Sequence, residues 1–499
     1  MVNQNFNQVF SFLCGQYKKR IAYSCENLHV SYERLLYQSN GFINQLQLKG
    51  VKPGDAVLFF SDHPLSIVIG FISCLRAGFT CIPLDLEMDP NKVISTVTQT
   101  GAKHMIVSKQ TVRQIKYLEN QHITLLEMEE VIELRTSYEG VSLNEKAFIF
   151  FTSGSTGIPK GVVTSVQGLL KYMKYTKKRF AFNQDDTFFC HAAFHTDMCL
   201  FALFTSLMTG SKCVLIPPAM RWKAEYLKLQ IKNQGVSVCH LVPSAFRLLT
   251  ASQKKIGWGN SVRLLFSTAE PFPIRAIEQI KGAFPNASLT NIYGSTETND
   301  SFAYTICVGC LGLEEVPIGT PYEYVSPLIL KSDFVPCKDG EIGELFINSD
   351  TNLINYFQQT KENTFTYMDA EGCLYFQTGD LVYKKGDIYY YVGRKHNKVK
   401  ISGYNVSMTE VEEVLLSYRS IKEAAVIAED LDGAKRLTAF LFTEGNVSTF
   451  DLRAHCAEKL PRYSIPTRYI FSSRTLPKTS SGKLDRLRLA RQVSEEMMT

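Results

Sequence analysis

A loop rich in glycine and hydroxyl residues carries the strongest chemical signal in the sequence. It reads FFTSGSTGIPKG from Phe150 to Gly161, after an apolar run that predicts a strand and before a helix expected to begin near Ser165. Glycines let the backbone approach a polyanion, hydroxyl and amide groups donate to its oxygens, and lysine supplies a mobile positive charge. The order differs from GxxxxGK[ST], so this is not the P-loop of NTPases. The loop is therefore predicted to bind a polyphosphate through Thr152, Ser153, Gly154, Ser155, Thr156, Gly157 and Lys160.

The cysteines give a weaker signal. All 13 are scattered along the chain, which favours free thiols in a reducing cytoplasm over a disulfide framework. Cys307 and Cys310 have CxxC spacing, but no second pair accompanies them, so a metal or redox role is disfavoured. The cysteines and histidines between Cys190 and Cys199 lie in an apolar stretch and are expected to pack in the core.

Length and charge limit the class of protein. A chain of 499 residues, 45% hydrophobic and 20% charged, is expected to form a large core and more than one domain. The net charge of +6 is spread along the chain, which argues against a nucleic-acid partner.

The amino terminus lacks the pattern of a secretory signal. The apolar stretch Val57–Leu75 is interrupted by Asp62, His63 and Pro64, so it predicts a buried strand and helix rather than a membrane span. We expect a cytoplasmic protein with no membrane contact.

Short β-rich runs alternate with segments long enough for helices. Ser31 is a candidate N-cap for a helix towards Leu48, and a Pro53-Gly54 turn then leads into the strand AVLFF. This alternation of strands and helices predicts an α/β fold with parallel sheets covered by helices. Near Gly393 the sequence becomes charged and rich in glycine, which predicts a domain boundary there. We expect a large amino-terminal domain of layered sheets and helices over residues 1–394 and a small α+β domain over residues 395–499.

The loop TSGSTGIPKG resembles the signature of the adenylate-forming superfamily, which includes acyl- and aryl-CoA synthetases, luciferases and the adenylation domains of nonribosomal peptide synthetases. Further motifs follow in the family's order: RAGFTCIPLD from Arg76, NIYGSTE from Asn291, PIGTP from Pro317, GELFI from Gly343, QTGDL from Gln377, GRKHNKVKISG from Gly393 and PKTSSGKLDR from Pro477. The resemblance covers nearly the whole chain. It implies an AMP-forming ligase that uses ATP and Mg²⁺.

The resemblance also implies roles for single residues. Tyr293 is expected to stack near the adenine, Thr296 to contact the α-phosphate and Glu297 to hold Mg²⁺, a hard cation that accepts one carboxylate beside ATP oxygens. Asp380 is expected to accept from the ribose hydroxyls, and Arg394 to reach the same sugar. The other ATP-binding candidates in NIYGSTE are Asn291, Ile292, Gly294 and Ser295.

Lys483 is the main catalytic candidate, together with Thr296 and Glu297. In the family this lysine enters the active site and bridges the substrate carboxylate and the α-phosphate. The reaction needs no protein nucleophile, since positioning and charge compensation are sufficient. In relatives the small domain then rotates to allow a thiol to attack the acyl-AMP. The usual hinge residue is Asp or Lys, whereas this chain has His396, and Asn405 and Ser407 also depart from the family pattern.

Asp197 bears on the choice of carboxylic acid. The residue occupies the slot where amino-acid-activating relatives bind the substrate α-ammonium, but the neighbouring Phe194-His195 is typical of fatty-acyl and aryl synthetases. An unpaired carboxylate in an apolar acyl pocket is costly, whereas an ammonium group neutralises it, so an amino acid is favoured. The alternative is that Asp197 serves as a cap or as the partner of a basic residue.

The same positional match to amino-acid-activating relatives gives the other pocket candidates. Bulky Phe201 and Phe266 favour a short substrate, and His240, Thr268 and Asp300 favour a polar one, such as serine or another small hydroxy or amino side chain. Each position is also compatible with core packing. The complete set is Asp197, Met198, Phe201, His240, Phe266, Thr268, Ile292, Asp300 and Ser301.

The acyl acceptor is expected to be a separate molecule. The chain contains no GGxS-like attachment site for phosphopantetheine, so a free-standing carrier protein is favoured, as in nonribosomal peptide synthesis of secondary metabolites and antibiotics, with coenzyme A as the alternative. A non-catalytic nucleotide-binding relic is disfavoured because Lys160, Glu297, Asp380 and Lys483 are all present.

Overall fold

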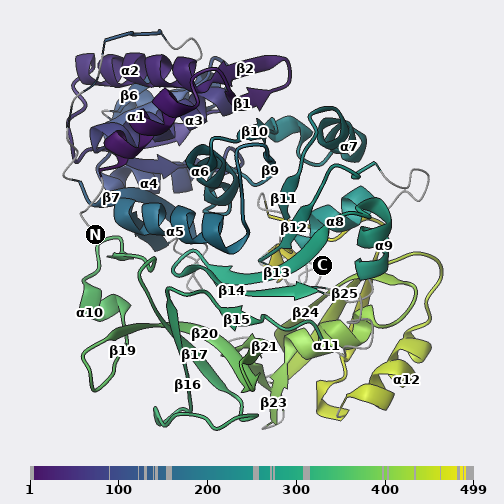
Figure 1. Ribbon diagram of the computed structural model, residues 1–499. Helices are drawn as coiled ribbons and strands as arrows, with labels where there is room; N and C mark the ends of the chain where they lie inside the picture. The colour runs from purple at the N-terminus through teal and green to yellow at the C-terminus, as the bar shows by residue number, and fades with distance from the viewer. Residues whose placement is uncertain are drawn as a thin grey trace. The chain divides into compact units, whose positions relative to one another are not determined.

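The protein is described from a computed structural model (Figure 1). It describes residues 5–88, 90–121, 123–128, 132–136, 138, 140, 144–152, 160–250, 258–269, 272, 276–306, 315–395, 398–401, 404–431, 434–460, 462–479, 484–486 and 488–490. The chain forms two compact units, Met1–Pro327 with Ile347–Phe376 and Leu328–Phe346 with Gln377–Thr499.

A nine-stranded sheet dominates the first unit. Its order is β15 (Thr320–Pro321), β14 (Asn299–Ile306), β13 (Ser288–Ser295), β12 (Leu264–Ser267), β11 (Val238–Leu241), β9 (Thr187–Cys190), β10 (Lys212–Leu215), β1 (Ile21–Cys25) and β2 (Leu28–Ser31). The strands from β13 to β1 pair in parallel, as predicted, while β14, β15 and β2 pair antiparallel, which was not predicted.

Several helices lie along the chain between the strands of this sheet. They are α5 (Val166–Arg179), α6 (Cys199–Thr209), α7 (Ala224–Asn233), α8 (Pro243–Thr250), α9 (Ala276–Ala283) and the 3-10 turn η2 (Pro218–Met220). Figure 1 shows β11, β12 and β13 beside α8 and α9. Leu227, Ala245 and Ile280 from the helices pack with Leu241 and Leu265 from the strands in one buried core. Burial of this apolar surface is the main force that fixes the strands.

The second sheet of this unit has seven strands. Its order is β18 (Asn355–Tyr356), β8 (Lys160–Ser165), β7 (Lys146–Thr152), β4 (Thr80–Pro83), β3 (Ala56–Phe60), β5 (His104–Val107) and β6 (Thr124–Glu127). Its helices are α1 (Phe6–Gln16), α2 (Tyr32–Leu48), α3 (Pro64–Ala77), α4 (Pro90–Thr100) and the 3-10 segment η1 (Thr111–Gln121). The predicted N-cap is confirmed, because the Ser31 side chain accepts from the Arg34 backbone N–H. The predicted strand and helix within Val57–Leu75 are β3 and α3.

A five-stranded sheet contains β16 (Val325–Leu330), β17 (Gly343–Ser349), β20 (Leu374–Lys385), β19 (Tyr367–Met368) and β21 (Ile388–Arg394). The short helix α10 (Lys361–Thr364) precedes β19. The second unit contains β22 (Lys398–Ile401), β23 (Tyr404–Ser407), α11 (Met408–Leu416), β24 (Ile421–Leu431), β25 (Ala434–Thr443), α12 (Thr449–Lys459), the turn η5 (Arg462–Ser464) and β26 (Arg468–Ser472). Its own core includes Val411, Leu415, Leu437 and Leu452. The expected mixed α/β fold, with a large unit and a smaller one, is confirmed.

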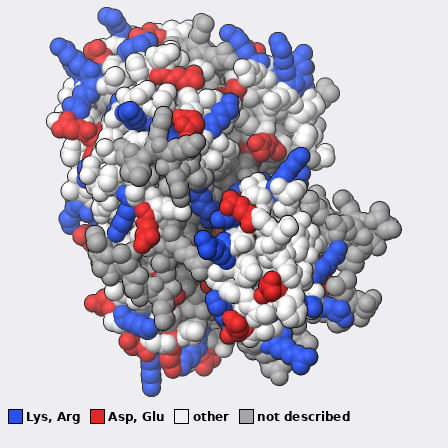
Figure 2. All heavy atoms as spheres, turned by 90° about the vertical axis from the view of Figure 1, so that its right-hand side faces the viewer, with Lys and Arg blue, Asp and Glu red and all other residues white. Residues whose placement is uncertain are grey.

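Charges of both signs are mixed over the face drawn in Figure 2, so that face shows no single-sign stripe. Among the described residues, no helix combines the length and the apolar character needed to cross a membrane.

Candidate active site

The two ends of the predicted phosphate loop lie opposite each other. Thr152 ends β7 and Lys160 begins β8, and these two residues are register partners in the antiparallel pair. The Thr152 hydroxyl donates to the Lys160 carbonyl oxygen over 3.4 Å. Ser153, Gly154, Ser155, Thr156 and Gly157 lie outside the described residues.

The segment that follows the loop contains a strand and then a helix. The strand β8 was not predicted. The helix α5 begins as predicted, with the Ser165 Oγ accepting from the Gly168 N–H over 2.8 Å.

A hairpin carries the NIYGSTE motif. Its first five residues, Asn291, Ile292, Tyr293, Gly294 and Ser295, form the end of β13, and the strand β14 returns antiparallel. Gly294 is required sterically, because a Cβ there would lie 2.1 Å from the Asn299 carbonyl oxygen. The Asn291 side-chain amide donates to the Pro317 carbonyl over 2.8 Å, and the Tyr293 ring lies 5.7 Å from that of Phe302. Thr296 and Glu297 therefore lie in a turn whose two sides are fixed.

Glu297 has a neighbour that the sequence did not indicate. The Tyr356 hydroxyl donates to Glu297 Oε1 over 2.9 Å. The Tyr356 ring also lies 5.4 Å from the Lys160 ammonium nitrogen. Tyr356 thus links the metal candidate of one motif to the lysine of another.

The Glu297 carboxylate is chemically suited to Mg²⁺. Within the described ranges no group of three or more His, Cys, Asp and Glu side chains could hold a metal. A single hard carboxylate, Glu297, suits a cation that keeps several waters and takes other oxygens from nucleotide phosphates. The donor set therefore suits a metal that arrives with ATP rather than a permanent protein cage.

In the second unit, Asp380 and Arg394 are paired with each other. They are register partners across β20 and β21, and Arg394 Nε donates to Asp380 Oδ1 over 3.0 Å. The Asp380 side chain is buried, whereas that of Arg394 is 56% exposed. The adjacent Lys395 ammonium donates to Glu344 Oε2 over 2.7 Å. The two ribose candidates thus form one ion pair, in which the aspartate is buried and the arginine is exposed.

Lys483 and His396 both lie outside the described residues. Around Lys483, the ends of its motif are joined: Lys478 and Leu484 form an isolated antiparallel bridge, and the Asp485 N–H donates to the Pro477 carbonyl over 2.9 Å.

Three pocket candidates form one aromatic cluster in the first unit. His240 of β11 and Phe266 of β12 are direct register partners. Phe201 of α6 covers both, with its ring 4.5 Å from His240 and 5.2 Å from Phe266. Because side chains alternate along a strand, His240 and Phe266 share one face of the sheet. The structure thus brings Phe201, His240 and Phe266 together, while their role in substrate binding stays a prediction.

His240 is buried without hydrogen bonds. Its side chain is 4% exposed, and neither ring nitrogen has a partner within the described residues. Burial lowers the pKa of His240 to about 3, so the ring is neutral at physiological pH. A neutral imidazole presents one donor and one acceptor, and an unpaired buried polar group is unusual in a folded protein.

Asp300 is a second acidic group near Asp197. The Tyr172 hydroxyl donates to Asp300 Oδ2 over 2.6 Å, and the Tyr324 hydroxyl donates to the Asp300 carbonyl over 2.6 Å. Burial raises the pKa of the Asp300 carboxyl to about 7, the Tyr172 hydrogen bond opposes this, and the charge of Asp197 adds to the increase. Asp197 and Asp300 are therefore within electrostatic reach of each other, and both side chains stay partly accessible.

The remaining candidates have other surroundings. Thr268 and Ile292 are buried, and Met198 packs partly buried against the core beneath α7 and α8. The Ser301 hydroxyl donates to the Thr298 carbonyl over 3.2 Å within its own hairpin.

Three residues of the cysteine and histidine cluster pack in the core, as expected: Cys190, His191 and Cys199 are buried, and His191 Nε2 lies 2.9 Å from the Arg221 carbonyl oxygen. His195 differs, since it is only partly buried and its Nδ1 lies 3.8 Å from Asp85 Oδ1. Cys307 and Cys310 lie outside the described residues.

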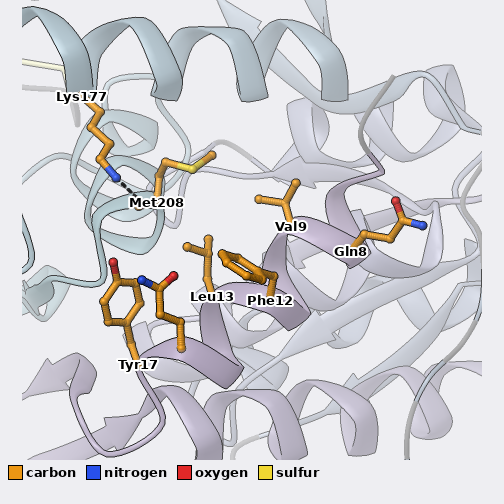
Figure 3. Close-up of a pocket in the computed structure, with 8 residues that line it drawn as sticks. Gln8, Val9, Phe12, Leu13, Tyr17, Lys177 and Met208 are labelled. Carbon is orange, nitrogen blue, oxygen red and sulfur yellow. Dashed lines mark hydrogen bonds between the residues drawn. The ribbon is translucent and has the colours of Figure 1, made fainter. Parts of the chain in front are cut away.

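A separate cavity of about 410 Å³ lies on the first unit (Figure 3). It is lined by residues of α1, such as Phe12 and Leu13, and by Lys177 and Met208. The Lys177 ammonium donates to the Met208 carbonyl over 3.4 Å. No predicted ATP or substrate residue lines this cavity, so it is distinct from the candidate active site.

Two family models match the chain. Residues 12–357 match the AMP-binding enzyme family, and residues 410–483 match the AMP-binding enzyme C-terminal domain. The chain belongs to the AMP-binding enzyme family. It is an AMP-forming ligase that uses ATP with Mg²⁺, as the motifs predicted.

Among curated relatives, the chain is 28% identical to an L-proline--[L-prolyl-carrier protein] ligase of Pseudomonas fluorescens, over 96% of this chain and 97% of that protein. It is 27% identical to gramicidin S synthase 2 of Brevibacillus brevis, over 97% of this chain but only 11% of that synthase. The chain therefore matches the first relative along nearly its whole length and the second along a small part of it.

Solved structures share the fold. Klebsiella oxytoca NpsA in complex with 3-hydroxyanthranilyl-AMSN matches with a TM-score of 0.84 at 22% identity, over 98% of this chain and 99% of that one. ATP-bound MatB from Rhodopseudomonas palustris matches with a TM-score of 0.85 at 18% identity, over 98% and 99%.

Proposed function

We propose that this enzyme activates a small amino acid with a polar side chain to its aminoacyl-AMP, releases pyrophosphate, and transfers the aminoacyl group to the phosphopantetheine thiol of a separate carrier protein. The observation that carries the proposal is that two acidic residues of the first unit, Asp197 and Asp300, lie within electrostatic reach of each other. The carrier-protein ligase that aligns over 97% of its own length supports the same reaction class.

Asp197 is assigned to the α-ammonium group of the substrate. A carboxylate in an apolar acyl pocket is stable when an ammonium group neutralises it. A fatty or aryl acid brings no positive charge to the site that contains Asp197 and Asp300. An amino acid therefore suits this pocket better.

His240 and Asp300 are assigned to the substrate side chain. A hydroxyl group both donates and accepts, so it can satisfy an unpaired imidazole nitrogen and a carboxyl oxygen. The rings of Phe201 and Phe266 fill the space beside His240, which favours a short side chain. Serine and similar hydroxy or amino side chains meet both conditions.

Six residues are assigned to ATP. Lys160, Thr296 and Lys483 would offset charge on the phosphates, Glu297 would hold Mg²⁺, and Asp380 with Arg394 would bind the ribose. Bound Mg²⁺ would supply charge neutralisation for the phosphate oxygens. The protein's own contribution is to hold two anionic reactants in line while donors compensate the charge that develops at phosphorus.

The small domain, residues 395–499, is assigned to carry Lys483 and to turn about His396 between the two half-reactions. The change of composition at Gly393 supports this boundary. A proline at position 396 restricts the backbone, so His396→Pro should preserve pyrophosphate exchange and suppress thiol transfer if it traps the adenylating orientation. Undiminished thiol transfer in this variant would exclude His396 as the hinge.

A cytoplasmic location is part of the proposal. The cysteines in the described part of the chain are free thiols, which suits a reducing compartment.

An ATP–pyrophosphate exchange screen tests the proposed substrate. Serine, homoserine, 2,3-diaminopropionate, alanine, proline, octanoate and benzoate form a suitable panel. We expect the small hydroxy or amino side chains to give the highest rates, and Asp197→Ala to reduce these rates by about 100-fold through loss of a buried counter-charge. If octanoate or benzoate is the best substrate and survives Asp197→Ala, an acyl- or aryl-CoA ligase is the correct function. Offering coenzyme A and a carrier protein separately shows which of the two thiols accepts the acyl group.

A further inference from the structure

One backbone segment, residues 351–357, connects the two motifs that are predicted to bind phosphate. The Leu353 N–H donates to the Glu297 carbonyl oxygen over 2.8 Å. A few residues later, the Phe357 N–H donates to the Gly161 carbonyl oxygen over 2.6 Å. The segment is therefore bonded both to the turn that contains Glu297 and to the strand that begins at Lys160.

Tyr356 lies within this segment and contacts both functional side chains. Its hydroxyl donates to Glu297 Oε1, and its ring faces the Lys160 ammonium group. Its position is fixed by neighbours that serve no catalytic role. The Tyr356 N–H donates to the Thr364 hydroxyl over 3.1 Å, and the ring packs against a small cluster that includes Phe376.

A phenol bonded to one oxygen of a carboxylate fixes the orientation of the other. Mg²⁺ requires near-ideal octahedral geometry, so a carboxylate that swings freely binds it poorly. Residues that orient a metal ligand typically contribute 10- to 100-fold in metal affinity or activity. The bond to Oε1 leaves Glu297 Oε2 available for a metal.

The ring has a second effect on Lys160. This lysine is exposed, and the negative face of an aromatic ring attracts an ammonium group. The contact keeps the Lys160 ammonium close to Glu297 without forming a bond that would compete with phosphate.

We propose that Tyr356 is a positioning residue of this ligase, whose hydroxyl orients Glu297 towards the metal–nucleotide and whose ring holds Lys160 beside the same phosphates. The inference rests on the proposed role of Glu297 as the Mg²⁺ ligand. It assigns a function to a residue outside the motifs that carry the family resemblance.

Tyr356→Phe tests the hydroxyl while keeping the ring, its packing and its contact with Lys160. We expect the metal concentration for half-saturation to rise by about 10-fold or more. Two readouts report it: electron paramagnetic resonance of Mn²⁺ bound to the protein with a non-hydrolysable ATP analogue, and the Mg²⁺ dependence of pyrophosphate exchange. The KM for the carboxylic acid and the melting temperature should not change. The matched control is Tyr390→Phe, since the Tyr390 ring stacks on Tyr383 in the other unit.

Glu297→Gln separates this inference from the function on which it rests. If Tyr356 acts through Glu297, adding Tyr356→Phe to Glu297→Gln should cause no further loss of metal affinity. If Glu297→Gln lowers metal affinity but Tyr356→Phe does not, the positioning role is wrong and the metal role of Glu297 stands. If Glu297→Gln leaves metal affinity unchanged, both assignments are wrong.

Discussion

Asp380 and Arg394 face each other across two neighbouring strands, and the guanidinium Nε lies 3.0 Å from the carboxylate Oδ1. The buried carboxylate has two oxygens, and the arginine fork has further donors. In the proposed ribose-binding role, the arginine would fix the orientation of the aspartate.

Asp380→Asn should weaken ATP binding. The amide keeps the shape but loses the charge that accepts strongly from ribose hydroxyls and pairs with Arg394, so we expect the KM for ATP to rise by about 10-fold, in line with the loss of one charge-assisted hydrogen bond. Initial-rate kinetics of pyrophosphate exchange with varied ATP measure this. Glu341→Gln is the matched control, because Glu341 forms a surface pair with Lys331 in the same unit. Equal KM values for the two variants would contradict the ribose assignment.

His240→Leu should separate stability from specificity. The buried imidazole has two unpaired nitrogens, so an apolar side chain of similar volume should leave the free protein as stable as before or stabilise it by about 1 kcal/mol. The same change should remove a hydrogen bond to a substrate hydroxyl and lower the serine-to-alanine preference by about 10-fold. Urea unfolding and exchange kinetics check the two parts. An unchanged preference would mean that His240 is only a core residue.

Asp300 should make stability fall as pH rises. The pKa of its carboxyl is raised from 3.8 to about 7 in the folded protein, so the folded state binds a proton more tightly than the unfolded chain. Between these two values the folded state carries more protons, and each increase in pH costs stability. Relative to Asp300→Asn, the wild type should lose about 2–3 kcal/mol between pH 5 and pH 8. Tyr172, Tyr322 and Tyr324 stay neutral in this range because burial raises the pKa of each, and the Asp197 charge adds to the effect.

Urea unfolding of both proteins at pH 5 and pH 8 measures this difference. A constant gap between the wild type and Asp300→Asn across that range would show that Asp300 is ionised throughout. Asp300 would then not hold a proton beside Asp197.

Local signals in the sequence were sufficient for much of the fold. The N-cap at Ser31 and the buried run from Val57 to Leu75 depend on neighbours close in sequence, so periodicity and capping rules identify them. The strand β8 was missed because its pairing with β7 and with β18, which lies far along the chain, decides its conformation. The mixed direction of the sheets was missed for the same reason.

Some features of the candidate site were indicated by the sequence, and others were not. Phe201, His240 and Phe266 were named as pocket candidates, and they lie together because two of them sit on adjacent strands in register. Tyr356 was not found, since its link to Glu297 joins residues 59 positions apart and no local motif marks it. The bond between Asp380 and Arg394 was not foreseen either, although both residues were named. The sequence indicates which residues do chemistry, while tertiary contacts decide which of them act together.

Lys483 is the residue on which ATP-dependent adenylation of an amino acid is expected to depend most. An ammonium group that acts only in the transition-state assembly contributes to rate more than to folding, so Lys483→Ala should keep the wild-type melting temperature. The most direct measurement is ATP–pyrophosphate exchange by the wild type and by Lys483→Ala, with and without the preferred small polar amino acid. We expect exchange that requires the amino acid in the wild type and a loss of at least about 100-fold in the variant. Exchange that does not depend on any amino acid, or a variant that retains near-normal exchange, would contradict the proposed function.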